Sequence, residues 1–164
     1  NLLDHAKFKV FDVNLRPGFF DIKLIEKLMR MSDLVKLNDE EIVILANQLG
    51  SDSDKLVEQI KFLHKEFKIN TICVTKGENG AVLFRDSDFY YNNGLTVNVA
   101  DTVGSGDSFL SALIFKLLTQ NDHQNALDFA CGVGTLIATK EGANPELSMN
   151  EIDEIIKQFK CNKT

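Results

Sequence analysis

The chain has 164 residues, of which 44% are hydrophobic and 26% are charged, and its formal net charge at pH 7 is −6. This composition excludes a disordered segment, a collagen-like repeat and a disulfide-rich miniprotein. The acidic balance argues against a nucleic-acid partner.

The first half of the chain alternates between strand and helix patterns. Residues 8–14 alternate apolar and polar side chains as a strand does, and the β-branched run from Ile69 to Thr75 is typical of a strand buried in a parallel sheet. Strands are predicted at 8–14, 34–37 and 69–75, and helices at 22–29, 41–49 and 56–67. This order predicts a mainly parallel sheet with crossover connections and helical cover.

The pattern changes after Thr75. Asn79-Gly80 stands between two apolar runs and predicts a β-hairpin turn. Further short strands are predicted at 81–84, 89–91 and 95–97, and helices at 107–120, 125–140 and 153–160. The chain contains neither an internal repeat nor a linker, so we expect a single α/β domain over residues 1–164.

Cysteine usage indicates the compartment. Cys73, Cys131 and Cys161 are widely spaced and odd in number, which favours reduced thiols and a cytoplasmic location. The histidines show no metal-ligand spacing with each other or with cysteine. No apolar run approaches the roughly 20 residues that span a bilayer, and no signal peptide opens the chain, so we expect no membrane partner.

The segment 101–109, with the sequence DTVGSGDSF, is the most informative. It joins a predicted strand to a predicted helix, and the start of a helix offers unpaired N–H donors and a positive dipole to an anion. Asp107 falls in the first helical turn, where its carboxylate can accept a proton from a hydroxyl. Neither GxGxxG nor GxxxxGK[ST] is completed, and a plain glycine turn with an acidic first helical turn remains the alternative.

This segment resembles the C-terminal signature DTxGAGD of the ribokinase-like (phosphofructokinase-B) carbohydrate kinases, with Ser105 where alanine is usual. The resemblance implies transfer of the ATP γ-phosphoryl group to a sugar hydroxyl. Asp107 would be the general base, and the amides of Gly104, Ser105 and Gly106 would form the anion hole. The implied fold is a three-layer α/β/α arrangement around a mainly parallel sheet with a short antiparallel hairpin region.

The segment 36–41 resembles the N-x-x-E element of the same family. The resemblance implies that Asn38 reaches nucleotide phosphate and that Glu41 organises Mg²⁺ through water. From the residues alone, Asn38 and Glu41 also form a capping box for the next helix, and one pair can do both.

The segment 75–80 resembles the turn that lines the nucleotide in this family. The resemblance implies ATP contacts from Thr75, Gly77 and Gly80, and an ordinary hairpin is the alternative. Cys131 stands where many members carry an asparagine near the adenine, so it is a further candidate for ATP binding.

The segment 142–145 resembles the loop that closes the adenine pocket, which makes Asn144 a candidate ATP contact. Carbonyl groups of Gly142, Asp101 and Val103 would hold a monovalent cation, K⁺, as in many members. A glycine helix cap followed by proline is the alternative.

Near the start, Asp12-Val13-Asn14-Leu15-Arg16 matches the D-x-N-x-R pattern of fructokinases and 2-keto-3-deoxygluconate kinases. Asn14 and Arg16 would contact the substrate or its phosphate, because a guanidinium binds such anions in a bidentate manner. The alternative is a surface arginine in a loop.

Taken together, five ordered segments predict a fructokinase-like enzyme that uses ATP and Mg²⁺ and whose partners are small molecules. We expect a longer chain whose N-terminal part, which carries the sugar-binding half, is absent here, and the longer protein is a candidate homo-oligomer. Two alternatives stay open: a non-catalytic nucleotide-binding module of this fold, and a kinase for ribose, ketodeoxygluconate or adenosine.

Overall fold

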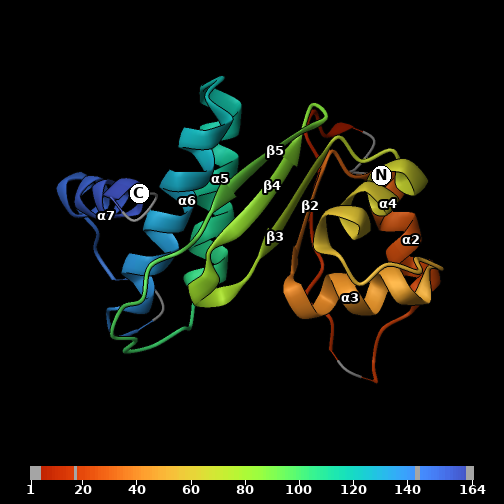
Figure 1. The fold of residues 1–164 in the computed structure, drawn as a ribbon, viewed down its shortest axis with the longest axis horizontal. Coiled ribbons are helices and arrows are strands. Elements are labelled where there is room, and N and C mark those ends of the chain that lie inside the picture. The colour runs from red at the N-terminus through yellow and green to blue at the C-terminus, as the bar shows by residue number, and fades with distance from the viewer. Residues whose placement is uncertain (1–4, 17, 143–144, 162–164) are drawn as a thin grey trace. The chain divides into compact units, whose positions relative to one another are not determined.

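The computed structural model describes residues 5–16, 18–142 and 145–161 (Figure 1). Its contacts divide the chain into two compact units. The N-terminal unit holds the described residues up to Thr75 together with Leu83–Phe89, and the C-terminal unit holds Lys76–Val82 together with the described residues from Tyr90 onward. The strands form a five-stranded sheet in the order β1-β2-β3-β4-β5.

The N-terminal unit alternates strands and helices, as the periodicity predicts. Its parallel strands pair β1 with β2 and β2 with β3, with Phe11 opposite Val35 and Val35 opposite Ile72. The predicted parallel sheet is therefore confirmed for these strands. The elements are β1 (Val10–Asp12), α2 (Ile22–Met31), β2 (Leu34–Asn38), α3 (Asp39–Gln48), α4 (Leu56–Phe67) and β3 (Thr71–Thr75).

Burial explains why β2 and β3 are the centre of this unit. Leu34 and Val35 are adjacent in β2 and both are fully buried, as are Ile72 and Cys73 in β3. Adjacent residues of a strand point to opposite faces, so both faces of these strands are covered. In contrast, β1 is shorter than the predicted strand at 8–14 and all three of its residues are only half-buried.

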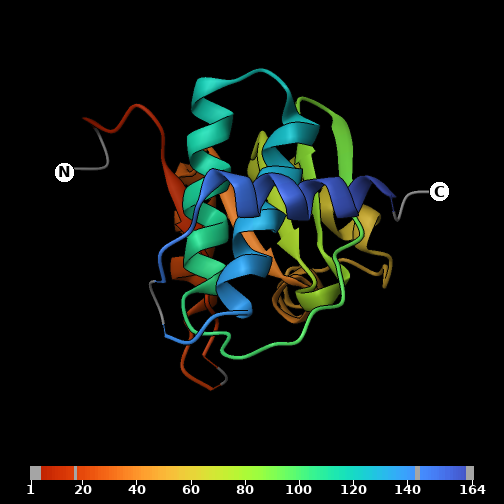
Figure 2. The same ribbon diagram turned by 90° about the vertical axis from the view of Figure 1, so that its left-hand side faces the viewer.

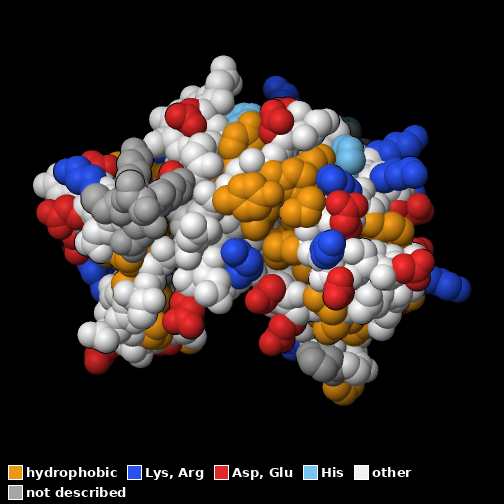
Figure 3. All heavy atoms as spheres, viewed as in Figure 1, with side chains coloured by type: hydrophobic (Ala, Val, Ile, Leu, Met, Phe, Trp, Pro, Cys, Tyr) orange, Lys and Arg blue, Asp and Glu red, His pale blue; other side chains and the backbone are white. Residues whose placement is uncertain are grey.

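A tight turn follows β3 and leads into the antiparallel part of the sheet. Gly77–Asn79 forms one turn of 3-10 helix, and Lys76 N donates to Gly80 O at 2.8 Å. The short connection forces β4 (Ala81–Arg85) to run antiparallel to its neighbour β3, because a parallel partner needs a long crossover. Hydrophobic side chains gather over β4 and β5 (Asp88–Asn92) on the face drawn in Figure 3.

Three helices form most of the C-terminal unit: α5 (Ser105–Thr119), α6 (His123–Ala138) and α7 (Met149–Cys161). α5 packs along α6, and α7 crosses α6 (Figures 1 and 2). α7 packs against α6 at Gly132, where a Cβ would lie in ordinary van der Waals contact, 3.4 Å from Ile156 and 3.7 Å from Ile152. None of the helices in the described ranges is long and apolar enough to cross a membrane.

One predicted strand is wrong. Residues 95–97 adopt neither strand nor helix, and so the segment 101–109 does not follow directly on a strand. A segment with strand propensity forms a strand only where a neighbouring strand pairs with it. Just before this segment, Gly94 packs against the turn that follows β3, where a Cβ would come within 1.9 Å of Glu78 O, and residues 95–97 continue without a strand partner.

Candidate active site

The first turn of α5 is built on a glycine. Gly104 precedes the helix with φ +79° and ψ −8°, a left-handed conformation that residues with a Cβ rarely adopt. The approach to it is a closed turn, in which Asp101 Oδ1 accepts from Val103 N at 2.9 Å and Thr102 O accepts from Ser105 N at 3.2 Å. The segment is also tied to the end of α6, because Ala100 N donates to Ala138 O at 2.8 Å.

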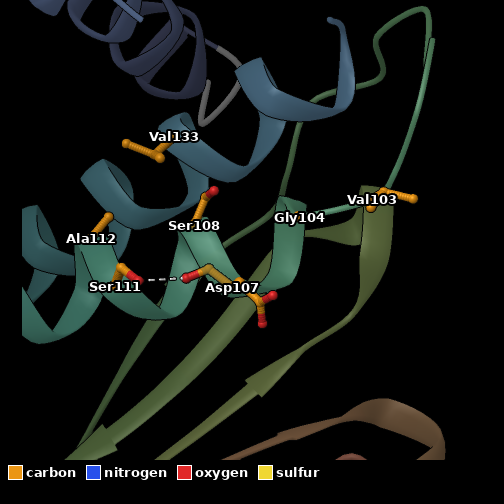
Figure 4. A pocket seen from close by; sticks show the side chains of 7 residues that line it. All are labelled: Val103, Gly104, Asp107, Ser108, Ser111, Ala112 and Val133. Atoms are coloured by element: carbon orange, nitrogen blue, oxygen red, sulfur yellow. Dashed lines mark hydrogen bonds between the residues drawn. The ribbon is translucent and has the colours of Figure 1, made fainter. Parts of the chain in front are cut away.

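An open pocket of about 570 Å³ lies beside this turn (Figure 4). The Asp107 side chain is exposed and projects from the first turn of α5, away from Val133 of α6. Ser111 Oγ donates to the Asp107 carbonyl at 2.8 Å, so the Asp107 carboxylate itself is not held by this bond. The lining residues are Val103, Gly104, Asp107, Ser108, Ser111, Ala112 and Val133.

The backbone amides at this helix start suit an anion. The first N–H groups of a helix have no acceptor within the helix, and the dipole places partial positive charge there. Of the three amides expected to form the anion hole, that of Ser105 already donates to Thr102. The amides of Gly104 and Gly106 and that of Asp107 therefore suit an anion better than the amide of Ser105.

The Ser105 side chain points to the neighbouring helix. Ser105 Oγ donates to Gly134 O of α6 at 2.9 Å, and a Cβ on Gly134 would lie 3.4 Å from Ser105 O. This bond joins the start of α5 to α6, and an alanine at position 105 could not form it. The Ser105 hydroxyl therefore stabilises the turn at Gly104 by binding it to α6.

The other candidates of the C-terminal unit lie on separate segments. Gly77 and Gly80 are in the turn after β3, with φ +55° and +78°. Cys131 is buried in α6 and is not among the residues that line the pocket. Gly142 has φ +85°, and Asn144 lies outside the described residues.

In the N-terminal unit, Glu41 joins two of the predicted segments, 36–41 and 12–16. Glu41 Oε2 accepts from Asn38 N at 2.8 Å, and Asn38 Oδ1 accepts from Glu41 N at 2.8 Å, so the capping-box alternative is confirmed. Glu41 Oε1 accepts from Leu15 N at 2.8 Å. The buried carboxylate thus joins the start of α3 to the loop that carries Asn14 and Arg16.

The strand ends around Glu41 are tied together as well. Lys36 Nζ of β2 lies 3.1 Å from Asp12 Oδ1 of β1, and both side chains are largely buried. Thr75 Oγ1 donates to Leu37 O at 3.3 Å, so the Thr75 hydroxyl is used within the sheet. Asn14 and Arg16 are exposed, and Asn14 has a left-handed φ of +45°.

The donor set limits how a metal could be held. Within residues 5–16, 18–142 and 145–161, no three His, Cys, Asp or Glu side chains cluster as a metal site. Each oxygen of Glu41 already accepts a backbone N–H. The remaining lone pairs suit a metal-bound water better than direct coordination, which fits Mg²⁺ because it keeps several waters.

Sequence reasoning missed a buried polar pair in the C-terminal unit. Asn92 is fully buried at the end of β5, and Asp128 is 3% exposed on α6. Asn92 Nδ2 donates to Asp128 Oδ1 at 2.7 Å. The available signal was a lone carboxylate in the apolar run of α6, since carboxylates are almost never fully buried without partners.

Comparison with known proteins identifies the family. The profile described as pfkB family carbohydrate kinase matches residues 1–149. A fructokinase from Escherichia coli is 29% identical over 147 residues, which cover 83% of this chain and 46% of that protein. An ATP-dependent ribose-1-phosphate kinase from Halopiger xanaduensis is 30% identical over 133 residues, covering 81% of this chain and 40% of that protein.

Solved structures confirm the predicted ribokinase-like α/β fold. The 2-dehydro-3-deoxygluconokinase of Thermotoga maritima superposes with a TM-score of 0.79 at 23% identity, covering 94% of this chain and 53% of that one. A ribokinase II of E. coli in complex with ATP and Mg²⁺ superposes with a TM-score of 0.75 at 24% identity, covering 91% and 48%. The chain spans about half the length of these relatives. With its family profile matched over residues 1–149, the chain belongs to the pfkB family of carbohydrate kinases.

Proposed function

We propose that the protein containing this chain transfers the γ-phosphoryl group of ATP to a hydroxyl of a sugar, with Asp107 as the general base. The observation that carries the proposal is the exposed Asp107 carboxylate in the first turn of α5, beside an open pocket and three residues after the left-handed Gly104. A base and an anion-binding backbone then lie within one helical turn. This arrangement suits phosphoryl transfer, which depends mainly on positioning and charge stabilisation.

In this mechanism Asp107 accepts the proton of the attacking sugar hydroxyl. The amides of Gly104 and Gly106 donate to the phosphoryl oxygens, where negative charge is present throughout the reaction. Ser105 contributes through its hydroxyl, which fixes the loop to α6 at Gly134. Mg²⁺, when bound, neutralises charge on the phosphates, and Glu41 would orient its water ligands.

The nucleotide contacts are assigned in the same proposal. Asn38 would reach a phosphate, and Gly77 and Gly80 would present backbone amides to the nucleotide. The E. coli ribokinase II structure was solved in complex with ATP and Mg²⁺, which supports nucleotide binding by this fold in that protein. Thr75, Cys131 and Asn144 are proposed with them, and the carbonyls of Asp101, Val103 and Gly142 are proposed to hold K⁺.

The acceptor is proposed to be fructose. The relatives are named for fructose, ribose 1-phosphate and 2-dehydro-3-deoxygluconate, which are a sugar, a sugar phosphate and a sugar acid. Arg16 is exposed on the loop that Glu41 holds and would bind a phosphate or carboxylate. We therefore propose that Asn14 and Arg16 contact the acceptor or the transferred phosphoryl group.

The test is an ATP-coupled assay of the full-length protein with fructose, ribose, ketodeoxygluconate and adenosine. We expect turnover with fructose above the rate without acceptor. Turnover with another acceptor alone would overturn the fructose assignment and keep the kinase. ATP binding without turnover on any of them would favour the non-catalytic module.

A further inference from the structure

A buried polar cluster holds the end of β5 against α6 in the C-terminal unit. Asp128 Oδ1 accepts two hydrogen bonds, from Asn92 Nδ2 at 2.7 Å and from Gln124 Nε2 at 2.9 Å. Gln124 Nε2 also donates to Tyr91 O at 3.0 Å. A buried carboxylate is costly unless it is hydrogen-bonded, so this cluster specifies one position of β5 relative to α6.

The cluster continues into the backbone beyond β5. Asn92 Oδ1 accepts from Gly94 N at 2.9 Å. The amide group of one side chain therefore binds α6 through its nitrogen and Gly94 through its oxygen. Turning this amide over would place a donor against the Gly94 N–H and an acceptor against the Asp128 carboxylate, and so its orientation is fixed.

Gly94 in turn lies directly against the turn after β3. A Cβ on Gly94 would come within 1.9 Å of Glu78 O and 2.6 Å of Gly80 N. From the other side, a Cβ on Gly80 would come within 2.1 Å of Asn92 O. The two backbones touch over this length with no room for a methyl group, so a shift of Gly94 must move the turn.

We propose that Asp128, Asn92 and Gly94 are positioning residues for the nucleotide, acting through the turn at Gly77–Gly80. This inference rests on the proposed function in one respect, namely that the turn contacts ATP. The first turn of α5 has supports of its own, the bonds of Ser105 to Thr102 and to Gly134. Weakening the cluster should therefore raise the KM for ATP and leave kcat nearly unchanged.

The experiment compares Asp128→Ala with Asp128→Asn in the full-length protein. Asparagine keeps an oxygen that can accept from Asn92, whereas alanine leaves the buried Asn92 amide N–H without the Asp128 acceptor. We expect Asp128→Ala to raise the KM for ATP about tenfold with kcat within about twofold of the wild type, and Asp128→Asn to restore most of the affinity. Gly94→Ala tests the same link without removing a buried charge and should also raise the KM for ATP.

A second readout does not depend on activity. Amide hydrogen exchange in residues 76–80 should become faster in both variants, because Asp128→Ala removes a bond that holds Asn92 and the methyl group of Gly94→Ala displaces the turn. The control is Gln59→Ala, which removes a side chain that is 1% exposed and donates to Ser53 O at 3.0 Å in the N-terminal unit. This variant should lose stability without changing the KM for ATP.

The outcomes separate this inference from the proposed function. Unchanged exchange in residues 76–80 in both variants would overturn the positioning role. Faster exchange with an unchanged KM for ATP would overturn the link to the nucleotide while the kinase stands. If Gln59→Ala raised the KM for ATP as much as Asp128→Ala does, the rise would reflect general destabilisation, and the inference would be overturned too. Absence of ATP-dependent turnover in the wild type would overturn the proposed function instead.

Discussion

Asp107 is the residue on which the proposed chemistry depends. Its carboxylate is exposed and its main-chain carbonyl, rather than its side chain, accepts from Ser111, so the side chain can be changed without breaking that bond. Because a carboxamide in this place could not accept a proton, we expect Asp107→Asn to lower kcat by about a thousandfold with little change in the KM for ATP. Steady-state kinetics of the full-length protein measure both.

The matched control for this variant is Asp153→Asn. Asp153 is an exposed carboxylate on α7, so the substitution makes the same change of charge far along the chain from α5. It should leave kcat unchanged. Turnover of Asp107→Asn close to that of Asp153→Asn would remove Asp107 from the role of base.

Cys73 is predicted to be chemically inert. Burial raises the pKa of the Cys73 thiol to about 12, with Asp12 adding to the rise and Lys36 opposing it. At pH 8 only about one thiol in ten thousand would then be thiolate, the reactive form. Iodoacetamide should therefore leave Cys73 unmodified in the native protein and modify it in denaturing urea, as mass spectrometry of the peptide would show. Rapid native labelling would contradict this burial.

At the scale of elements, the Lys36–Asp12 pair joins β1 to β2. The side chains are 8% and 16% exposed, and the two residues are register partners in the sheet. Lys36→Ala would leave a largely buried carboxylate without its partner, so we expect it to lower the free energy of unfolding by about 3 kcal/mol. Urea denaturation measures this loss.

The double variant Asp12→Leu with Lys36→Met is the control for the pair. It removes both charges and should recover most of the stability, because well-packed apolar groups often replace a buried pair at no cost. A single variant that loses less than about 0.5 kcal/mol would show that the pair is solvated in the native state.

The start of α7 carries a pH-dependent cap. Hydrogen bonds from Lys140 and from the backbone and hydroxyl of Ser148 lower the pKa of Glu151 from 4.5 to about 2. The stabilisation is therefore fully present above pH 4.5 and is lost as the pH falls towards 2. Glu151→Gln should lower the urea midpoint near neutral pH, and its difference from the wild type should shrink as the pH falls below 4.5. A difference that is independent of pH would contradict the cap.

At the scale of the whole molecule, the contacts form two units, and each contains buried apolar residues. The parallel strands β2 and β3 are buried on both faces, whereas the segment from Asn93 to Ala100 is irregular and largely exposed. Native-state hydrogen exchange should therefore be slowest in β2 and β3 and fast in residues 95–99. Protection of residues 95–99 equal to that of β3 would mean that they do form a strand in solution.

Most helices and strands followed from periodicity, but residues 95–97 did not. Their apolar and β-branched composition favours a strand, yet no local feature reports that Gly94 is held against the turn at Glu78 and Gly80. Asn38 and Glu41 show the reverse case. Their three-residue spacing predicts the capping box, while the bond from Leu15 N to Glu41 Oε1 joins residues 26 apart and has no local signal.

Local sequence patterns predict the family, the alternation of strands and helices, and the helix start after Gly104 that carries Asp107. These depend on neighbouring residues, whose propensities and hydrogen bonds act over one or two turns. Three contacts are visible only in the folded chain: Ser105 binds Gly134, Glu41 holds the Leu15 loop, and Asp128 and Asn92 reach the turn at Gly80 through Gly94. Such contacts depend on which segments become neighbours, and burial then makes their hydrogen bonds obligatory.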